Sequence, residues 1–382
     1  MSIDVRAVQA ALKTERLDGW LLYDFHGSNP VANRVTDMGR IGKLATRRLF
    51  YLIPASGEPR ALVHAIEKHN LDHLPGSKTV YAGREQLESG LQAILGGATR
   101  VAMEYSPRNA IPYVSRVDAG TVELVRSLGA DVVSSGDLIQ QFEAHWNDHA
   151  IATHRRASDK LYRIKDQAFD AVRRRLNDGV STTEYDIQHL MVGWFRDEGL
   201  VADSAPCVSA QENAGDPHYL ASAAKHRIIR TNELVLLDLW GKLAEPGAVY
   251  ADITWIGFVG DAVPAPMTRA FDTICAARDA AVDCVQGAAM AGRVVRGFEA
   301  DKASRQVLID AGYALAILHR TGHSLGEDVH GNGAHLDDYE THDERKLLPG
   351  SGFTIEPGLY FDTFGVRTEI NMVWTADRKS VV

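Results

Sequence analysis

The sequence predicts two domains, a small α/β domain at the N-terminus and a larger, mixed α+β domain after it. The chain has 382 residues, a length at which two domains are expected. Short apolar runs alternate with helical patterns in the first part of the chain, which is typical of a small α/β domain. Polar and charged residues interrupt the strand-like runs of the second part. We therefore place the two domains at residues 1–146 and 147–382.

Composition and charge exclude several classes of protein. The chain is 45% hydrophobic and 24% charged, as ordinary globular proteins are. Its net charge of -9 gives no electrostatic reason to bind nucleic acid or an anionic membrane. Three cysteines without a Cys-x-x-Cys pair argue against a disulfide framework and a thiolate zinc site. We expect a cytoplasmic protein, because no apolar run approaches the roughly 18 residues of a membrane span and no signal segment opens the chain.

The first domain is predicted to contain a helix at residues 4–17 and then six short strands. The strands are expected at Trp20–Tyr23, Leu49–Ile53, Arg60–Val63, Thr79–Tyr81, Val101–Glu104 and Asp131–Val133. Helical patterns lie between some of them, at Glu85–Leu95 and Asp118–Leu128. Asp118 suits the N-cap of the second of these helices, and Gly129 suits its end.

The second domain begins with one long, charged helix at residues 147–177. A second helix is predicted at Thr182–Glu198, with Ser181 and Glu184 at the spacing of a capping box. The elements expected after it are strands at Leu234–Trp240 and Tyr250–Val259, helices at Thr268–Met290 and Phe298–Ala311, and strands at Tyr313–Leu318, Phe353–Phe361 and Val366–Trp374.

Two acids stand in the apolar runs of the first two of these strands. Asp238 interrupts Leu234–Trp240, and Asp252 lies two residues before Thr254, so Asp252 and Thr254 share a strand face. A connection that contains Gly and Pro joins the two strands, which predicts a hairpin that brings the acids together. A carboxylate in a buried strand costs several kcal/mol unless a metal or a partner compensates it.

The segment from His319 to Glu369 carries the rest of the polar pattern. Glu356 precedes a Pro-Gly turn, and Arg367 and Glu369 lie two apart on one predicted strand face. With His323, the four acids would supply five oxygen and nitrogen ligands, a set that suits Mn, Co, Fe or Zn. Five protein ligands exceed the need of one open catalytic ion, so carboxylates that bridge two ions would account for the surplus.

A competing motif lies in the same segment. Gly322-His-Ser324-Leu-Gly326 fits the G-x-S-x-G nucleophile elbow of serine hydrolases. That motif needs a helix that starts at the serine, but the residues after Ser324 have two early glycines and no apolar stripe. We therefore favour the metal site over a serine nucleophile.

These residues resemble the pita-bread metallopeptidases, namely methionine aminopeptidase, aminopeptidase P and prolidase. All five metal-ligand positions of that family are filled in order, by Asp238, Asp252, His323, Glu356 and Glu369. The resemblance covers the whole chain. It implies a creatinase-type N-terminal domain over residues 1–146 and a pita-bread catalytic domain over residues 147–382.

The resemblance also assigns roles outside the metal ligands. It implies a substrate-binding His218, further active-site histidines His319 and His330, and the Tyr360 and Arg367 of the prolidase and aminopeptidase P branch. Glu356 is expected both to bind metal and to shuttle a proton. The chain departs from the family at Gly331, where an acidic residue is common, and in its longer connection between Asp238 and Asp252.

By resemblance, the chain is expected to be an Xaa-Pro dipeptidase that uses two divalent ions, Mn before Co, Zn or Fe. Its substrate would be a small peptide with proline in second place, and the enzyme would be a homodimer. Two alternatives remain open. One is an aminopeptidase P-like enzyme that acts on longer peptides, and the other is a metal-dependent C–N hydrolase or lyase that acts on a small zwitterion. A non-catalytic binding protein is disfavoured because every ligand position is filled.

Overall fold

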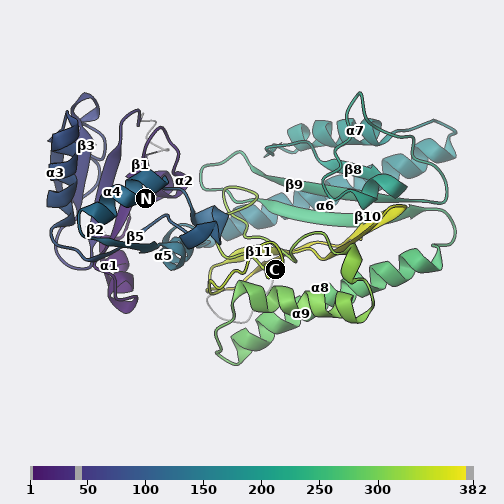
Figure 1. Ribbon diagram of the computed structural model, residues 1–382. Coiled ribbons are helices and arrows are strands. Elements are labelled where there is room, and N and C mark those ends of the chain that lie inside the picture. Colours follow the sequence, from purple (N-terminus) through teal and green to yellow (C-terminus); the bar gives the residue numbers. More distant parts are fainter. Residues whose placement is uncertain (1–2, 39–44, 376–382) are drawn as a thin grey trace. The chain divides into compact units, whose positions relative to one another are not determined.

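The computed structural model describes residues 3–38 and 45–375 (Figure 1). The chain divides into two compact units, residues 1–143 and residues 144–382. Each unit has hydrophobic clusters of its own. Among the residues described, no helix is both long and apolar enough to cross a membrane.

The N-terminal unit is a six-stranded sheet in the order β4-β3-β2-β1-β5-β6. β2 is antiparallel to both of its neighbours, and the other adjacent pairs are parallel. The strands are β1 (Gly19–Asp24), β2 (Leu49–Pro54), β3 (Arg60–His64), β4 (Ser77–Tyr81), β5 (Arg100–Met103) and β6 (Asp131–Ser134). All six strands predicted from the sequence are therefore present, with ends shifted by at most two residues.

Helices cover both faces of this sheet. One hydrophobic cluster joins it to α1 (Val5–Thr14), α2 (Pro30–Val35) and α5 (Gly136–Phe142). A second cluster joins it to α3 (Arg84–Leu95) and α4 (Ala119–Ser127). Asp118 caps α4 as predicted, because its side chain accepts a hydrogen bond from the backbone N–H of Thr121.

Glu104 directly follows β5 and is fully buried in the N-terminal unit. Its carboxylate accepts hydrogen bonds from Trp20 Nε1 at 2.7 Å, Asn29 Nδ2 at 2.7 Å and Ser135 Oγ at 3.0 Å. Burial raises the pKa of Glu104, and the hydrogen bonds from Trp20, Asn29 and Ser135 oppose that shift. Both carboxylate oxygens have partners, so this buried acid is explained by structure alone.

The C-terminal unit is organised around β9 (Glu233–Leu243) and β10 (Ala251–Val259), which pair antiparallel. The short strands β7 (Leu200–Val201) and β8 (Cys207–Ala210) also pair with β9. α6 (Asp148–Asn177) and α7 (Glu184–Asp197) pack against this sheet through one hydrophobic cluster. α6 buries a stripe with helical spacing, which includes Ala157, Leu161, Ile164 and Ala168.

A second pair of helices and four short strands complete this unit. α8 (Ala265–Met290) and α9 (Gly297–Asp310) lie on the other side of the unit from α6 and α7, with the C-terminal strands between the two pairs (Figure 1). These strands form two antiparallel pairs: β11 (Gly352–Ile355) with β14 (Ile370–Val373), and β12 (Gly358–Phe361) with β13 (Phe364–Arg367). Short 3-10 helices occur at Ala65–Glu67, Pro107–Asn109, Pro112–Val114, Gln211–Gly215 and Ala314–Ala316.

Three predictions about the C-terminal unit are wrong. Tyr313–Leu318 is not a strand but contains a 3-10 turn, and its apolar side chains Leu315 and Leu318 are exposed, so the apolar run did not mark a core element. The predicted strands Phe353–Phe361 and Val366–Trp374 are each broken in two, because their halves pair with different partners. The N-cap of α7 is Thr183, which exchanges hydrogen bonds with Asp186, and not Ser181.

We expect Glu104→Gln to destabilise the N-terminal unit by about 1–3 kcal/mol, because an amide cannot accept from all three donors and leaves one of them unsatisfied. Burial raises the folded-state pKa of Glu104, so the wild-type side chain contributes stability that is lost as pH rises. The deficit of the Gln variant should therefore shrink as pH increases.

Trp20 is the single tryptophan of residues 1–143, so ¹⁹F NMR of fluorotryptophan-labelled protein can follow this unit during urea unfolding. Glu123→Gln, at an exposed position on α4, is the control and should leave stability unchanged. Equal stability of the Glu104→Gln and Glu123→Gln variants would contradict the prediction.

Candidate metal centre

The antiparallel pairing of β9 and β10 places Asp238 and Asp252 on one face of the sheet. Asp238 lies opposite Thr254, and Asp252 lies opposite Trp240, so the two acids are diagonal neighbours. The predicted hairpin is thus confirmed. Asn371 of β14 holds Asp252 by its backbone: Asn371 Oδ1 accepts from Asp252 N at 3.0 Å, and Asn371 Nδ2 donates to Asp252 O at 2.5 Å.

His323 approaches the acids from a buried segment beside β11. Its ring Nδ1 lies 3.1 Å from Ser324 O, and a carbonyl can only accept, so Nδ1 carries the proton. In the neutral ring the Nε2 lone pair is then free. Nε2 lies 3.6 Å from Asp252 Oδ2 and 3.3 Å from Glu356 Oε1. Burial lowers the pKa of His323, which favours the neutral form that metals bind.

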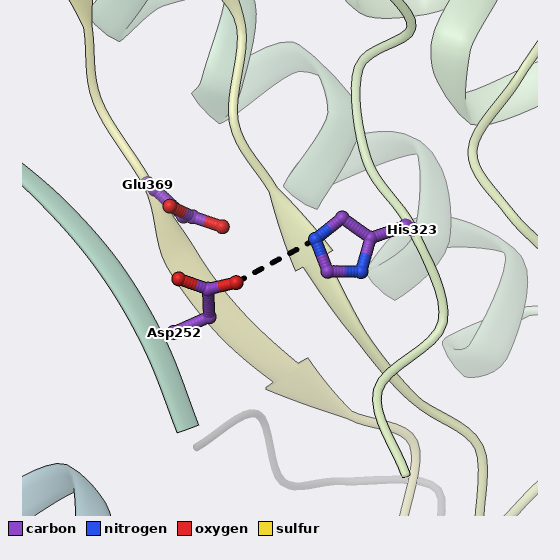
Figure 2. Close-up of side chains that lie close together, drawn as sticks. All are labelled: Asp252, His323 and Glu369. Carbon is purple, nitrogen blue, oxygen red and sulfur yellow. Dashed lines mark ion pairs between the residues drawn. The ribbon is translucent and has the colours of Figure 1, made fainter. Parts of the chain in front are cut away.

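Asp252, His323 and Glu369 lie close together and each offers one donor atom (Figure 2). These three atoms lie within 4.8 Å of one another, and all three residues are buried. Two carboxylate oxygens, Asp252 Oδ1 and Glu369 Oε1, have no hydrogen-bond partner within the described part of the chain. Buried polar atoms are almost always paired, so these two oxygens fit the binding of a cation.

The other two predicted ligands adjoin this trio. Asp238 Oδ2 accepts a hydrogen bond of 2.5 Å from Arg367 Nη2. Glu356 Oε1 accepts one of 3.0 Å from Thr354 Oγ1 and faces His323. The structure therefore gathers all five predicted ligands around one buried region.

The charges of the acids in this region repel one another. Burial raises the pKa of Asp252 well above its ordinary value, and the neighbouring Asp238 and Glu356 raise it further. Burial and the charge of Asp252 likewise raise the pKa of Glu369 well above its ordinary value. The pKa of Glu356 is lowered instead: burial raises it, but the electrostatic interactions with neighbouring groups, first His323 and then His319 and Arg367, outweigh that effect. Bound cations would relieve the repulsion among these groups.

A chain of hydrogen bonds runs behind the acids. Arg367 Nη1 donates to the Tyr360 hydroxyl at 2.8 Å, and that hydroxyl lies 2.6 Å from His319 Nε2. His319 Nδ1 lies 2.7 Å from Arg320 O and so carries the proton, which makes Nε2 the acceptor from Tyr360. Burial raises the pKa of Tyr360 to about 12, so its hydroxyl stays protonated near neutral pH.

His330 and His218 are placed differently from the other predicted residues. The ring centroid of His330 lies 4.4 Å from that of His323, although His330 also reaches solvent. His218 is exposed. Within the described residues, its ring makes no hydrogen bond or ion pair with any of the five predicted metal ligands. The structure thus brings His330 next to the centre but shows no such link for His218.

Ser324 is not a nucleophile. Its side chain is buried and its Oγ accepts a hydrogen bond from Gly333 N at 3.1 Å. The residues that follow it form bends and not the helix that a nucleophile elbow requires.

Three residues were given no positioning role in the sequence analysis: Thr254, which was placed only on the strand face of Asp252, and Thr354 and Asn371, which were not named. Thr254 Oγ1 donates to Glu369 Oε2 at 2.8 Å and accepts from Arg367 Nε at 3.1 Å. Thr354 Oγ1 also accepts from the backbone N–H of His323 at 3.0 Å. Each of the three lies two residues from a predicted acidic ligand in the sequence, and this spacing was the signal that could have found them.

Comparison with known proteins agrees with this geometry. Residues 157–376 match metallopeptidase family M24. The chain is 24% identical over 334 residues to the probable dipeptidase PepE of Mycobacterium tuberculosis, covering 85% of this chain and 80% of that protein. It is 32% identical over 171 residues to an Xaa-Pro dipeptidase of Lactobacillus delbrueckii, covering 44% of this chain and 42% of that protein.

The same fold occurs in a solved structure. The crystal structure of dipeptidase PepE from Mycobacterium ulcerans superposes with a TM-score of 0.74 at 23% identity, covering 99% of this chain and 93% of that one. The chain therefore has the pita-bread fold with an additional α/β unit at its N-terminus. With the family match over more than half of its length, the chain belongs to metallopeptidase family M24.

Proposed function

We propose that the chain is an Xaa-Pro dipeptidase that holds two divalent cations between Asp238, Asp252, His323, Glu356 and Glu369. The observation that carries the proposal is the buried group of Asp252, His323 and Glu369, in which two carboxylate oxygens lack partners among the described residues. The Xaa-Pro dipeptidase of L. delbrueckii, to which the chain is 32% identical over 171 residues, supports the choice of substrate.

The donor set favours two cations and manganese. Asp252, His323 and Glu369 are close enough to hold one ion, while Asp238 and Glu356 add two further carboxylates beside them. Carboxylates can bridge two ions, and a set with four carboxylates and one imidazole suits Mn among the common metals. When bound, the two cations would polarise the scissile carbonyl and lower the pKa of a water to about 7.

The protein side chains would move the proton and hold the substrate. Glu356 Oε1 is engaged by Thr354, which leaves Oε2 to take a proton from the attacking water and pass it to the proline nitrogen. His330, next to His323 and open to solvent, would donate to the carbonyl oxygen as negative charge develops there. We assign the exposed His218 to substrate binding as well.

Arg367 and Tyr360 would orient the centre. Arg367 contacts Asp238, Thr254 and Tyr360 through three different nitrogens, so its planar guanidinium fixes the positions of all three. A proline amide lacks an N–H. The site must therefore recognise the ring and the chain ends of the substrate, which fits a small, closed dipeptide site.

Removal of metal should abolish cleavage of Ala-Pro, and addition of Mn should restore it, because metal-activated water is the nucleophile in this proposal. Binding can be followed independently by the rise in melting temperature on addition of Mn. Asp252→Asn removes one buried charge, so it should raise the melting temperature of the metal-free protein while it weakens the response to Mn. Full activity after exhaustive chelation would contradict the proposal.

Glu356→Gln should reduce turnover by about 10²–10⁴-fold, because the amide cannot shuttle a proton. The variant should remain folded, since the amide oxygen can still accept from Thr354. Glu344→Gln, at an exposed position of the same unit, is the matched control and should keep wild-type turnover. Steady-state kinetics on Ala-Pro give the comparison, and near-normal turnover of Glu356→Gln would remove Glu356 from the proton transfer.

A comparison of peptide substrates of different length distinguishes a dipeptidase from an aminopeptidase P-like enzyme. We expect kcat/KM for Ala-Pro to exceed that for Ala-Pro-Ala by about tenfold or more, because a closed site leaves an extra residue without space. Ala-Ala serves as the control for proline. Equal rates on the tripeptide would identify an aminopeptidase P-like enzyme, and failure on every Xaa-Pro peptide would favour a different C–N bond.

A further inference from the structure

The N-terminal unit contains a cavity of about 1200 Å³ that the proposed peptidase function does not use. All of its lining residues lie between Tyr23 and Leu124, within that unit. The lining includes residues at the carboxyl ends of the parallel strands β1, β3 and β4, such as Tyr23, His64 and Tyr81. Ligands of α/β proteins bind beyond this edge of the sheet.

The cavity is positively charged, in a chain whose net charge is -9. Its lining has two acids, Glu88 and Asp118, against four arginines, which are Arg47, Arg48, Arg84 and Arg116. Asp118 is occupied as the cap of α4, with both oxygens bonded to Thr121. Within residues 3–38 and 45–375, no carboxylate forms an ion pair with Arg47, Arg48 or Arg116. The lining thus carries a net charge of two positive, which a dianion would neutralise.

Two helices begin at this cavity. Gly83, the N-cap of α3, lines it, and a Cβ at Gly83 would meet no atom within 4 Å. Gln86 Oε1 accepts from the N–H groups of Ala82 and Gly83, which leaves the next N–H groups of the first turn available. Gly120, in the first turn of α4, lines the cavity too. Backbone N–H groups and the helix dipole favour a phosphate at such a place.

One wall of the cavity is rigid and partly aromatic. The Tyr81 hydroxyl donates to Arg48 O at 2.7 Å. His64 Nδ1 accepts from Ile66 N at 3.1 Å, so Nε2 carries the proton and donates to Ala82 O at 3.1 Å. His64 also packs edge-on against Tyr81. Both rings are therefore fixed by the fold, and with Leu87 and Leu124 they offer an apolar surface beside the arginines.

We propose that this cavity binds a small phosphate monoester, with the phosphate at the arginines and the start of α3 and the organic group against the apolar wall. Arginine forks match the oxygens of a phosphate in pairs, and a phosphate monoester carries close to two negative charges at neutral pH. The site lies apart from the metal centre in sequence and belongs to the other unit, so the inference does not depend on the proposed function.

Calorimetric titration of the full-length protein tests the proposal with phenyl phosphate, inorganic phosphate and benzoate as probes. Phenyl phosphate should bind more tightly than either of the other two, because only it engages both parts of the cavity. The double variant Arg48→Gln with Arg116→Gln should weaken its binding by about tenfold or more. Arg6→Gln with Lys13→Gln removes the same charge from exposed positions of α1, which packs on the opposite face of the sheet, and should leave binding unchanged.

The Gly83→Asp variant distinguishes a loss of ligand binding from a loss of folding. The backbone at Gly83 has φ -104° and ψ 171°, which any residue adopts, and an Asp at an N-cap stabilises a helix. The variant should therefore melt no lower than the wild type, yet lose phenyl phosphate, because its carboxylate takes the N–H groups and repels the anion. Unchanged binding by this variant would overturn the proposal.

Two further outcomes would also overturn it. If benzoate binds as tightly as phenyl phosphate, the site does not recognise phosphate. If Asp252→Asn with Glu369→Gln abolishes binding while the arginine double variant retains it, the anion occupies the metal centre and not this cavity. Absence of binding by all three probes would show that the arginines only surround solvent.

Discussion

The repulsion between four neighbouring carboxylates, two of them buried and two partly buried, is the constraint on which the C-terminal unit depends. Asp238, Asp252, Glu356 and Glu369 come together in a region where the net pKa shift of all but Glu356 is upward, with burial as the main cause. The guanidinium of Arg367 contacts one acid of this group directly, Asp238. One guanidinium does not balance four carboxylates. A divalent metal bound among these carboxylates would therefore favour the folded state of this unit, because it would remove a repulsion that folding creates.

The same constraint explains details of the local structure. β13 ends at Arg367 and β14 begins at Ile370, so Glu369 stands in a break between strands that pair with different partners. The break lets the chain turn Glu369 towards Asp252 while Thr254 holds its second oxygen. A continuous strand would fix the direction of Glu369 by alternation alone and would leave less freedom to meet the other ligands.

Features of the fold and of the site were predictable from the sequence where the interacting residues lie close together along the chain, and not where they lie far apart. The hairpin that brings Asp238 and Asp252 together was predictable, because two bare acids in apolar runs, joined by a short Gly/Pro connection, form a local pattern. The break before Glu369 was not found, since the apolar run is continuous and the change of partner involves β11 and β12. The two-residue spacing places Thr254 beside Asp252 on one strand face, but it does not show the contact with Glu369, 115 residues away, on which the role of Thr254 depends. Tyr313–Leu318 was misassigned because an apolar run does not show whether a partner strand exists.

Burial alone does not distinguish a structural acid from a ligand, but hydrogen-bond satisfaction does. Glu104 is as buried as Glu369, and burial raises the pKa of both. Three donors satisfy the carboxylate of Glu104, whereas Glu369 keeps an oxygen without a partner in the described chain.

In the N-terminal cavity, the charged groups that lack a partner of opposite charge are cations and not carboxylates. There the acid Asp118 is satisfied by Thr121, and it is the guanidinium groups of Arg48 and Arg116 that lack a carboxylate among the described residues. Partly exposed cations are easily solvated, so lack of a partner means less for them than for a buried carboxylate. A ligand is therefore inferred from convergence: the arginines, the start of α3 and an apolar wall surround one cavity at the edge of the sheet where α/β proteins bind ligands.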